Sequence, residues 1–350
     1  MSLTRRGKVA AGASTVAVLA LAAVGYFAVF PNRAPAFVQD AMSRVGLAEP
    51  PPPPQCPLTG EPAPQGQVPD RPALAIKVEN LPDARPQAGL DRADVVYEEP
   101  VEGGITRFIV VYQCHNAGRV GPVRSGRTTD PKVLVQFGHP VMGYAGGQAP
   151  VVRAIERAGV IDMNYDIAIS AYDRDDSRPT PHNLYTSTRQ LWKAAKSRDG
   201  APAPVFSYDP EVAGPSRKAR TVHLPFSSYS DVYWTWSRTQ SAWLRSHGTV
   251  PHVLEDGTQV RAANVVVMQV EVSNGPIVDA AGNHSPEVEL TGSGRAYVFR
   301  DGRMVIGRWE RETLKDVTTF VTKTGRQIAL APGVTWVELL PSTISVEADR

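Results

Sequence analysis

Hydrophobic residues gather first near the start of the chain, in an uncharged stretch from Val9 to Phe30 that follows a short basic tip. Residues 1–30 therefore predict a cytoplasmic tip and a transmembrane anchor, because this stretch is long enough to cross a bilayer and its basic end stays inside. The protein would then be a single-pass protein of the cell membrane, with the rest of the chain outside. The small residues of Ala34-Pro35-Ala36 leave signal cleavage and secretion open as the alternative.

A proline-rich linker, residues 31–70, separates this anchor from the folded part. Its run from Pro50 to Pro54 favours an extended polyproline II conformation. Such a spacer would hold the folded part away from the membrane surface.

Between residues 71 and 200, apolar runs rich in β-branched residues alternate with segments of helical spacing. Strands are predicted at 73–78, 93–97, 105–112 and 167–171, and helices at 129–137, 151–158 and 187–196, the last with Ser187 as its N-cap. This alternation predicts a mixed α/β domain over residues 71–200.

From residue 201 to 350 the pattern becomes β-rich. Strands are predicted at 231–236, 264–272, 294–299, 304–309, 327–330 and 334–339, with hairpin turns at Asp301-Gly302 and Thr324-Gly325. This region predicts a mainly antiparallel β domain, so the fold class is α+β. We expect Trp309 and Trp336 to pack in its core rather than to stack on sugars.

Composition agrees with a folded protein, since 42% of residues are hydrophobic and 21% are charged. Lys and Arg number 37, of which Arg5, Arg6 and Lys8 precede residue 31, so 34 remain against 35 Asp and Glu. A nearly neutral folded part argues against nucleic acid as a partner. The two cysteines, Cys56 and Cys114, form a candidate disulfide in an exported protein.

Charged side chains crowd the run from Asp94 to Arg127, at and between the ends of two predicted strands. Its carboxylates are Glu98, Glu99 and Glu102, and its guanidiniums are Arg107, Arg124 and Arg127. Two carboxylates in one cleft can act as acid and base, which makes Glu102 and Glu98 candidate catalytic residues for glycan hydrolysis. The alternative is a structural network of ion pairs.

Ser125 lies between Arg124 and Arg127, outside any GxSxG or SxxK motif, and so predicts an anion-binding turn better than a nucleophile. His182 and Asn183 lie in a proline-fixed loop, residues 178–185, which we expect to face the charged run across a cleft. They are candidate ligand-binding residues, although a lone histidine is more often structural. The sequence predicts no bound cofactor and no metal site, because His182 has no accompanying metal-ligand motif.

Several motifs together resemble those of the YerB-like family of bacterial envelope proteins. They are Arg71-Pro-Ala-Leu-Ala-Ile-Lys-Val-Glu-Asn80, Ala84-Arg-Pro-Gln-Ala-Gly-Leu90, Ala93-Asp-Val-Val-Tyr-Glu98, Glu102-Gly-Gly-Ile-Thr-Arg-Phe108, Gly121-Pro-Val-Arg-Ser-Gly-Arg127, Pro181-His-Asn-Leu-Tyr185, Gly294-Arg-Ala-Tyr-Val-Phe-Arg-Asp-Gly302, Gly307-Arg-Trp309 and Pro332-Gly-Val-Thr-Trp336. The resemblance extends from about Arg71 to Pro341. It implies an envelope protein without a settled activity. Members are often lipoproteins, and this chain departs by having an apolar anchor in place of a lipidated cysteine.

The leading hypothesis is a membrane-anchored extracytoplasmic protein that binds a cell-envelope glycan or peptidoglycan fragment. Arg107, Arg124 and Arg127 would bind its acidic groups, with Ser125, His182 and Asn183 as polar contacts. One alternative is a cell-wall hydrolase or lyase with Glu102 or Glu98 as acid or base. Another is a non-catalytic scaffold that binds an envelope protein.

Overall fold

Strand β14 (Asn264–Val270) shows most directly how the sequence builds the fold. Its apolar residues alternate between two cores, with Val265 and Val267 on one side and Val266 and Met268 on the other. A strand buried on both faces has a continuous apolar sequence, and β14 lies inside a sheet between β17 and β20. The computed structural model describes residues 52–212, 214–279 and 281–349.

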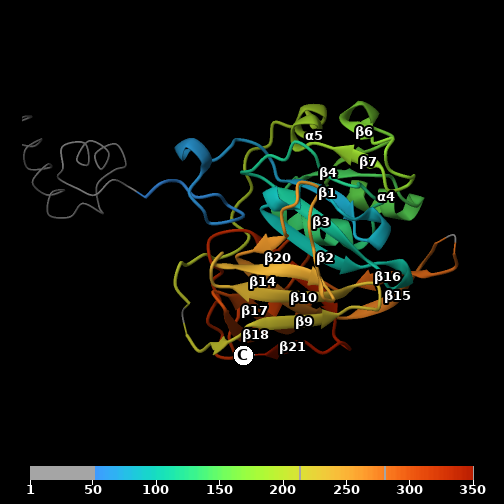
Figure 1. Ribbon diagram of the computed structural model, residues 1–350. Helices are drawn as coiled ribbons and strands as arrows, with labels where there is room; N and C mark the ends of the chain where they lie inside the picture. Colours follow the sequence, from blue (N-terminus) through green and yellow to red (C-terminus); the bar gives the residue numbers. More distant parts are fainter. Residues whose placement is uncertain (1–51, 213, 280, 350) are drawn as a thin grey trace, which may run out of the picture. The chain divides into compact units, whose positions relative to one another are not determined.

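Strands from both halves of the chain form one sheet of 11 strands (Figure 1). Its order is β19-β18-β17-β14-β20-β2-β3-β1-β4-β5, and β8 pairs with β18. The bounds are β1 Leu74–Glu79, β2 Val95–Pro100, β3 Thr106–Tyr112, β4 Val141–Tyr144, β5 Ile161–Asn164, β8 Arg217–Lys218, β17 Gly292–Arg300, β18 Arg303–Arg311, β19 Thr319–Val321 and β20 Thr335–Pro341. The parallel pair of β2 and β20 joins the two halves within this sheet.

Helices lie on both faces of the N-terminal strands. Val133 of α3 (Thr129–Leu134) and Ile155 of α4 (Ala149–Arg157) belong to one core, and Leu191 of α5 (Thr188–Ala195) belongs to the other. Short 3-10 helices are η2 Pro64–Gly66, η3 Pro82–Ala84, η4 Leu90–Arg92, η5 Glu102–Gly104, η6 Val135–Phe137 and η7 Ile169–Ala171. Ser187 caps α5 as predicted, since its Oγ accepts the N–H of Gln190 at 3.2 Å.

A second sheet of six strands packs against the C-terminal half of the first. Its order is β12-β11-β10-β9-β21, with β13 paired to β11. The bounds are β9 Thr221–Pro225, β10 Asp231–Ser237, β11 Ala242–His247, β12 Val250–Pro251, β13 Arg261–Ala262 and β21 Glu347–Asp349. Trp234 meets Trp336 with ring centroids 5.2 Å apart, and Trp243 meets Phe299 at 5.6 Å. These edge-to-face aromatic contacts fill the space between the sheets.

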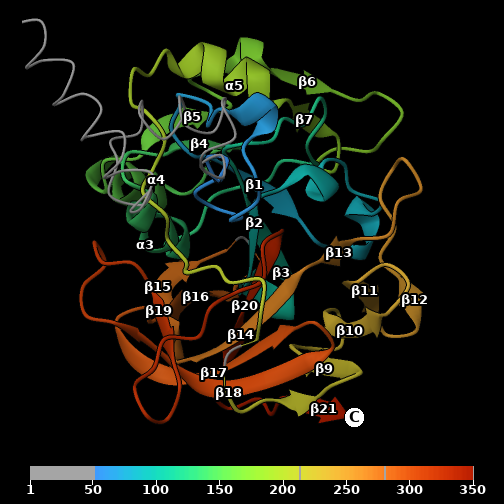
Figure 2. The same cartoon turned by 90° about the vertical axis from the view of Figure 1, so that its left-hand side faces the viewer.

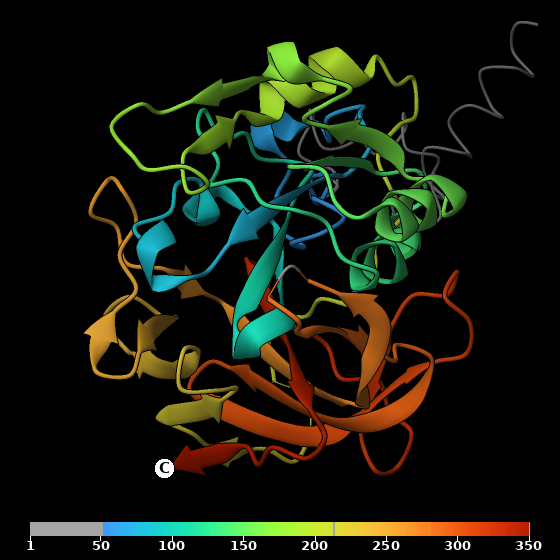
Figure 3. The same cartoon turned by 90° about the vertical axis from the view of Figure 1, so that its right-hand side faces the viewer.

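Two small two-stranded sheets complete the structure: β15 (Val272–Val278) with β16 (His284–Val288), and β6 (Tyr172–Arg174) with β7 (Leu184–Thr186). The long strands β17 and β18 curve together along the lower side of the molecule in Figures 2 and 3. The structure confirms the α+β class, with mixed strands and helices first and antiparallel pairs dominant later.

Two predicted strands are wrong. The segment 167–171 is a turn that ends in η7, because the Asn164 side chain accepts the N–H groups of Asp166 and Ile167 and bends the chain. Ile167 and Ile169 are exposed. The segment 327–330 makes only isolated bridges, at Gln327 and Leu330.

In the described part of the chain, no helix is long and apolar enough to cross a membrane. The predicted anchor, residues 1–30, lies outside the described residues, as does the linker up to residue 51. The anchor and the division at residues 200 and 201 stay predictions.

Candidate functional site

Strand β2 carries Glu98 and Glu99 side by side, and neighbouring side chains of a strand point to opposite faces of its sheet. Glu98 faces the second sheet, where its Oε2 accepts a hydrogen bond from Arg245 Nη2 at 2.7 Å. Thr106 Oγ1 donates to its other oxygen at 2.6 Å. Glu98 and Arg245 are fully buried, so this carboxylate occupies a structural ion pair.

Glu99 faces α3 on the opposite side of the sheet. Its partner is the buried amine of Lys77, which also donates to Asp130 Oδ1 at 2.6 Å. Burial raises the pKa of Glu99 to about 7, and the negative charge of Asp130 adds to this, while Lys77 opposes it. One ammonium thus serves two buried carboxylates, out of reach of a ligand in solvent.

Glu102 begins the 3-10 helix η5, directly after β2, and lies closer to the surface. Its Oε2 accepts two hydrogen bonds from Arg127, from Nε at 2.7 Å and from Nη2 at 2.5 Å. Burial acts to raise the pKa of Glu102, but hydrogen bonding to Arg127 and its charge prevail and lower it. An ionised carboxylate held in this way is a poor general acid, and its evident role is to orient Arg127.

Arg107, Arg124 and Arg127, which we call the arginine row, lie around the backbone of Ser125. Arg107 Nη1 donates to the Ser125 carbonyl at 3.0 Å, and Arg127 Nη1 reaches the same oxygen at 3.4 Å. Arg124 Nε donates to Glu79 Oε1 at 2.9 Å. Burial, followed by the like charges of Arg127 and Arg124, lowers the pKa of Arg107 to about 9.

The predicted loop 178–185 is linked to the arginine row by a contact of His182. His182 Nδ1 lies 2.8 Å from Glu79 Oε2, so one buried carboxylate joins the histidine to Arg124. Asn183 is directed elsewhere, since its Oδ1 accepts a hydrogen bond from Arg174 at 2.8 Å. The structure therefore brings His182 to the row and leaves Asn183 outside it.

Two small cavities flank the row in place of one shared cleft. The Arg127 cavity, of about 320 Å³, is lined by Glu102, Ser125, Arg127, Gly147, Gln148, Val151, Ile277, Asp279 and Ser285. The Arg124 cavity, of about 180 Å³, has Arg124, Arg174 and Pro181 in its wall. Segments 124–126 and 145–146 are hydrogen-bonded to each other, from Gly126 N to Gly146 O and from Ala145 N to Arg124 O, both at 3.0 Å. This backbone pairing gives both cavities a common wall.

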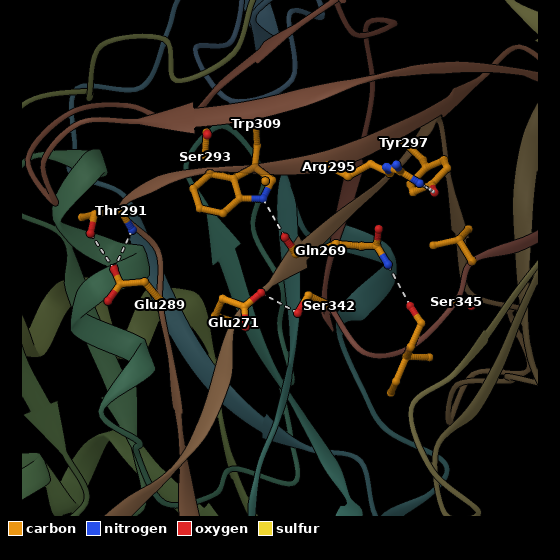
Figure 4. A pocket seen from close by; sticks show the side chains of 13 residues that line it. Gln269, Glu271, Glu289, Thr291, Ser293, Arg295, Tyr297, Trp309, Ser342 and Ser345 are labelled. Atoms are coloured by element: carbon orange, nitrogen blue, oxygen red, sulfur yellow. Dashed lines mark hydrogen bonds between the residues drawn. The ribbon is translucent and has the colours of Figure 1, made fainter.

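A larger cavity of about 560 Å³ lies away from the predicted site, between β14, β17 and β18 (Figure 4). Trp309 is only 3% exposed at its floor, and its Nε1 donates to the Gln269 carbonyl at 2.8 Å. Glu271 accepts from Ser342, and Glu289 accepts from Thr291. The two carboxylates of this cavity thus already accept hydrogen bonds from hydroxyl groups of the protein, and Trp309 is a core residue as expected.

The structure joins Cys56 and Cys114 in a disulfide, as predicted. The bond fastens the segment before β1 to the end of β3. Beside it, the buried carboxylate of Asp94 accepts the N–H of Cys114 at 2.9 Å and contacts His115 Nδ1 at 2.5 Å. This corner of the structure is therefore held by a covalent bond and by the hydrogen bonds of Asp94 together.

Comparison with known proteins covers most of the described chain. Residues 58–201 match the family described as "Protein of unknown function (DUF3048) N-terminal domain", and residues 222–337 match its C-terminal domain. The chain belongs to the DUF3048 family.

The chain is also 30% identical over 296 residues to YerB of Bacillus subtilis (strain 168), a protein whose name describes it as a lipoprotein. The similarity covers 82% of this chain and 86% of YerB. A crystal structure of YerB superposes with a TM-score of 0.73 at 26% identity, over 84% of this chain and 99% of that one. These similarities confirm the resemblance to the YerB-like family.

Sequence reasoning missed several residues that build the site in this DUF3048 protein. Lys77 and Glu79 interrupt an otherwise apolar strand, and such charges inside a buried run are a signal that could have found them. Asp279 and Ser285 come from the β15–β16 hairpin, far away in sequence. Nothing local to these two residues connects them with the Arg127 cavity.

Proposed function

We propose that this protein is an envelope-attached, extracytoplasmic binding protein whose arginine row takes an acidic group of a cell-envelope glycan or peptidoglycan fragment. The predicted N-terminal anchor and the lipoprotein name of YerB support the location. The arrangement of charge in the arginine row supports binding of an anion.

The observation that carries the proposal is the missing partner of Arg107. Arg124 is paired with Glu79 and Arg127 with Glu102, whereas no described carboxylate lies within salt-bridge distance of Arg107. Arg107 is 5% exposed, and its Nε has no described acceptor. Arg107 thus adds a buried positive charge without a direct acidic partner, and a ligand carboxylate beside Arg127, in the cavity that Asp279 also lines, would offset it.

The Arg127 cavity also offers contacts for the rest of a glycan. Ser125, Gln148 and Ser285 present hydroxyl and amide groups, while Val151 and Ile277 present apolar surface. Its volume of about 320 Å³ lies near the lower end of ligand sites, roughly 300–1,000 Å³. The cavity therefore fits a small unit of a glycan or its peptide rather than a long polymer.

Binding is favoured over hydrolysis because the three carboxylates of the predicted cluster, Glu98, Glu99 and Glu102, each already have a cationic partner. Glu98 and Glu99 are fully buried, and the lowered pKa of Glu102 keeps it ionised. None of the three is placed to deliver a proton to a glycosidic oxygen in the Arg127 cavity.

The test compares soluble peptidoglycan fragments with the same fragments after amidation of their carboxyl groups. Wild-type protein should bind the native fragments, and Arg127→Gln should lower the affinity by roughly tenfold or more, the equivalent of one charge-assisted hydrogen bond. The matched control is Arg308→Gln, because Arg308 forms an Arg–Glu pair with Glu310 on an exposed surface. Equal binding of native and amidated fragments, or no binding by wild type, would refute the proposal.

A further inference from the structure

A second cavity, of about 580 Å³, forms where three segments distant in sequence meet. These segments are β8 with the two residues after it, the end of β10, and the turn between β17 and β18. We call it the Trp236 cavity, after the indole in its wall. It shares no lining residue with the Arg127 or Arg124 cavity.

Four cationic side chains line the Trp236 cavity: Lys218, Arg220, Arg238 and Arg303. Its single carboxylate, Asp301, is already engaged, because Asp301 Oδ2 accepts from the buried Arg300 Nε at 2.7 Å. Among the residues that the structure describes, no Asp or Glu lies within salt-bridge distance of the four cations. The cavity therefore carries a positive charge that the protein itself leaves unbalanced.

The strand pairing concentrates this charge further. Lys218 of β8 and Arg303 of β18 are direct partners across an antiparallel pair. Like charges at such positions destabilise a sheet. Arg303 has only uncharged partners here, with its Nε donating to Ser216 Oγ at 2.7 Å and its Nη2 reaching the Ser216 carbonyl at 3.3 Å. A bound anion would remove this repulsion.

Trp236 gives the cavity an apolar wall at a fixed position. It packs against Gly302, where an added Cβ would lie 2.7 Å from the indole. Asp301 and Gly302 both have positive φ, 53° and 64°, as the predicted two-residue hairpin turn requires. The tight turn thus brings the ring and the basic side chains to one cavity.

We infer that the Trp236 cavity binds a phosphorylated saccharide, with the phosphate among Arg220, Arg238 and Arg303 and the sugar ring against Trp236. A phosphomonoester carries a charge of about −1.5 to −2 near neutral pH, which suits several cations better than a single carboxylate does. Guanidinium groups bind phosphate oxygens in pairs of parallel hydrogen bonds. The volume of about 580 Å³ accommodates a sugar in addition to the phosphate.

Calorimetry on the full chain in detergent tests this inference with glucose 1-phosphate, glucose, glycerol phosphate and inorganic phosphate. Glucose 1-phosphate should bind most tightly, and the double variant Arg220→Gln with Arg238→Gln should lower its affinity at least tenfold. Trp236→Leu should weaken glucose 1-phosphate more than inorganic phosphate. The exposed Arg308→Gln is the control for loss of one surface charge.

Three results would overturn the inference. The first is unchanged binding in the double variant, and the second is an equal loss in the Arg308→Gln control. The third is glycerol phosphate binding as tightly as glucose 1-phosphate, because the cavity would then recognise a phosphate or a lipid headgroup without reading a sugar.

Discussion

Replacing Arg245 with methionine tests how much one buried ion pair between the second sheet and strand β2 of the main sheet contributes to stability. Arg245 lies on β11 and is fully buried, and its guanidinium contacts Glu98 on β2 at 2.7 Å. It also lies 2.8 Å from His252 Nδ1 and 2.9 Å from His247 Nε2. One side chain therefore serves a carboxylate and two histidines that are themselves buried or nearly so.

Removing one partner of a buried ion pair costs about 3–5 kcal/mol, because the other charge is left without compensation. Glu98 would keep its hydrogen bonds from Thr106 and Asn80, which moderates the loss. We therefore expect Arg245→Met to lower the free energy of unfolding by about 3 kcal/mol. The double variant Glu98→Gln with Arg245→Met should recover much of this, since the charge that Arg245 compensates on Glu98 is then removed as well.

Urea unfolding of a soluble chain that starts at residue 52 measures the effect as a lower midpoint with an unchanged slope. Arg308→Met is the matched control, because the exposed Arg308–Glu310 pair should contribute no more than about 1 kcal/mol. A loss below about 1 kcal/mol in Arg245→Met, or a double variant as unstable as the single one, would refute the reasoning.

Three further predictions concern stability and pH. Cys114→Ser should lower the free energy of unfolding by up to about 4 kcal/mol, because the disulfide closes a loop with a sequence separation of 58. Adding reductant to the wild-type protein should lower its free energy of unfolding by the same amount. The hydrogen bond to Asp94 raises the pKa of His115, so the stability that this contact contributes is complete below about pH 6.5 and is lost as pH rises through the pKa of the folded state. An NMR titration of His115 should show the raised pKa, and Asp94→Asn should abolish the shift. Burial raises the pKa of Glu99 to about 7, so stability should fall as pH rises from about 4.5 toward 7, and Glu99→Gln should flatten that dependence in unfolding curves measured across this range.

Structural features that depend on residues close together in the sequence could be predicted from it. Strands β1 and β3, helix α5 with its Ser187 cap, and the Asp301-Gly302 turn all follow from local periodicity or turn chemistry. The strand predicted at 167–171 is wrong because its two isoleucines suggested a buried strand, whereas the Asn164 side chain bends the backbone just before them.

The sequence indicated which charged residues to consider as a candidate site, but it could not assign their contacts. Treating Glu98 and Glu99 as one cluster overlooked the alternation of side chains along a strand, which sends them to opposite faces. The partner of Glu98 is Arg245, 147 positions away, and no local pattern pairs two residues at that separation. His182 was correctly expected near the charged run, although Glu79, which holds it there, was not singled out.

Asp130 shows what the carboxylates around the arginine row do in the structure. Its Oδ2 accepts the backbone N–H of Arg127 at 2.6 Å, and its Oδ1 accepts from the buried Lys77 at 2.6 Å. The backbone at Arg127 is thereby fixed to the core of the sheet, just as Glu79 and Glu102 fix the guanidiniums of Arg124 and Arg127. Rigid positioning lowers the entropy lost when a ligand binds. Glu79, Glu102 and Asp130 are thus better understood as supports that position Arg124 and Arg127 than as the acids and bases of a hydrolase.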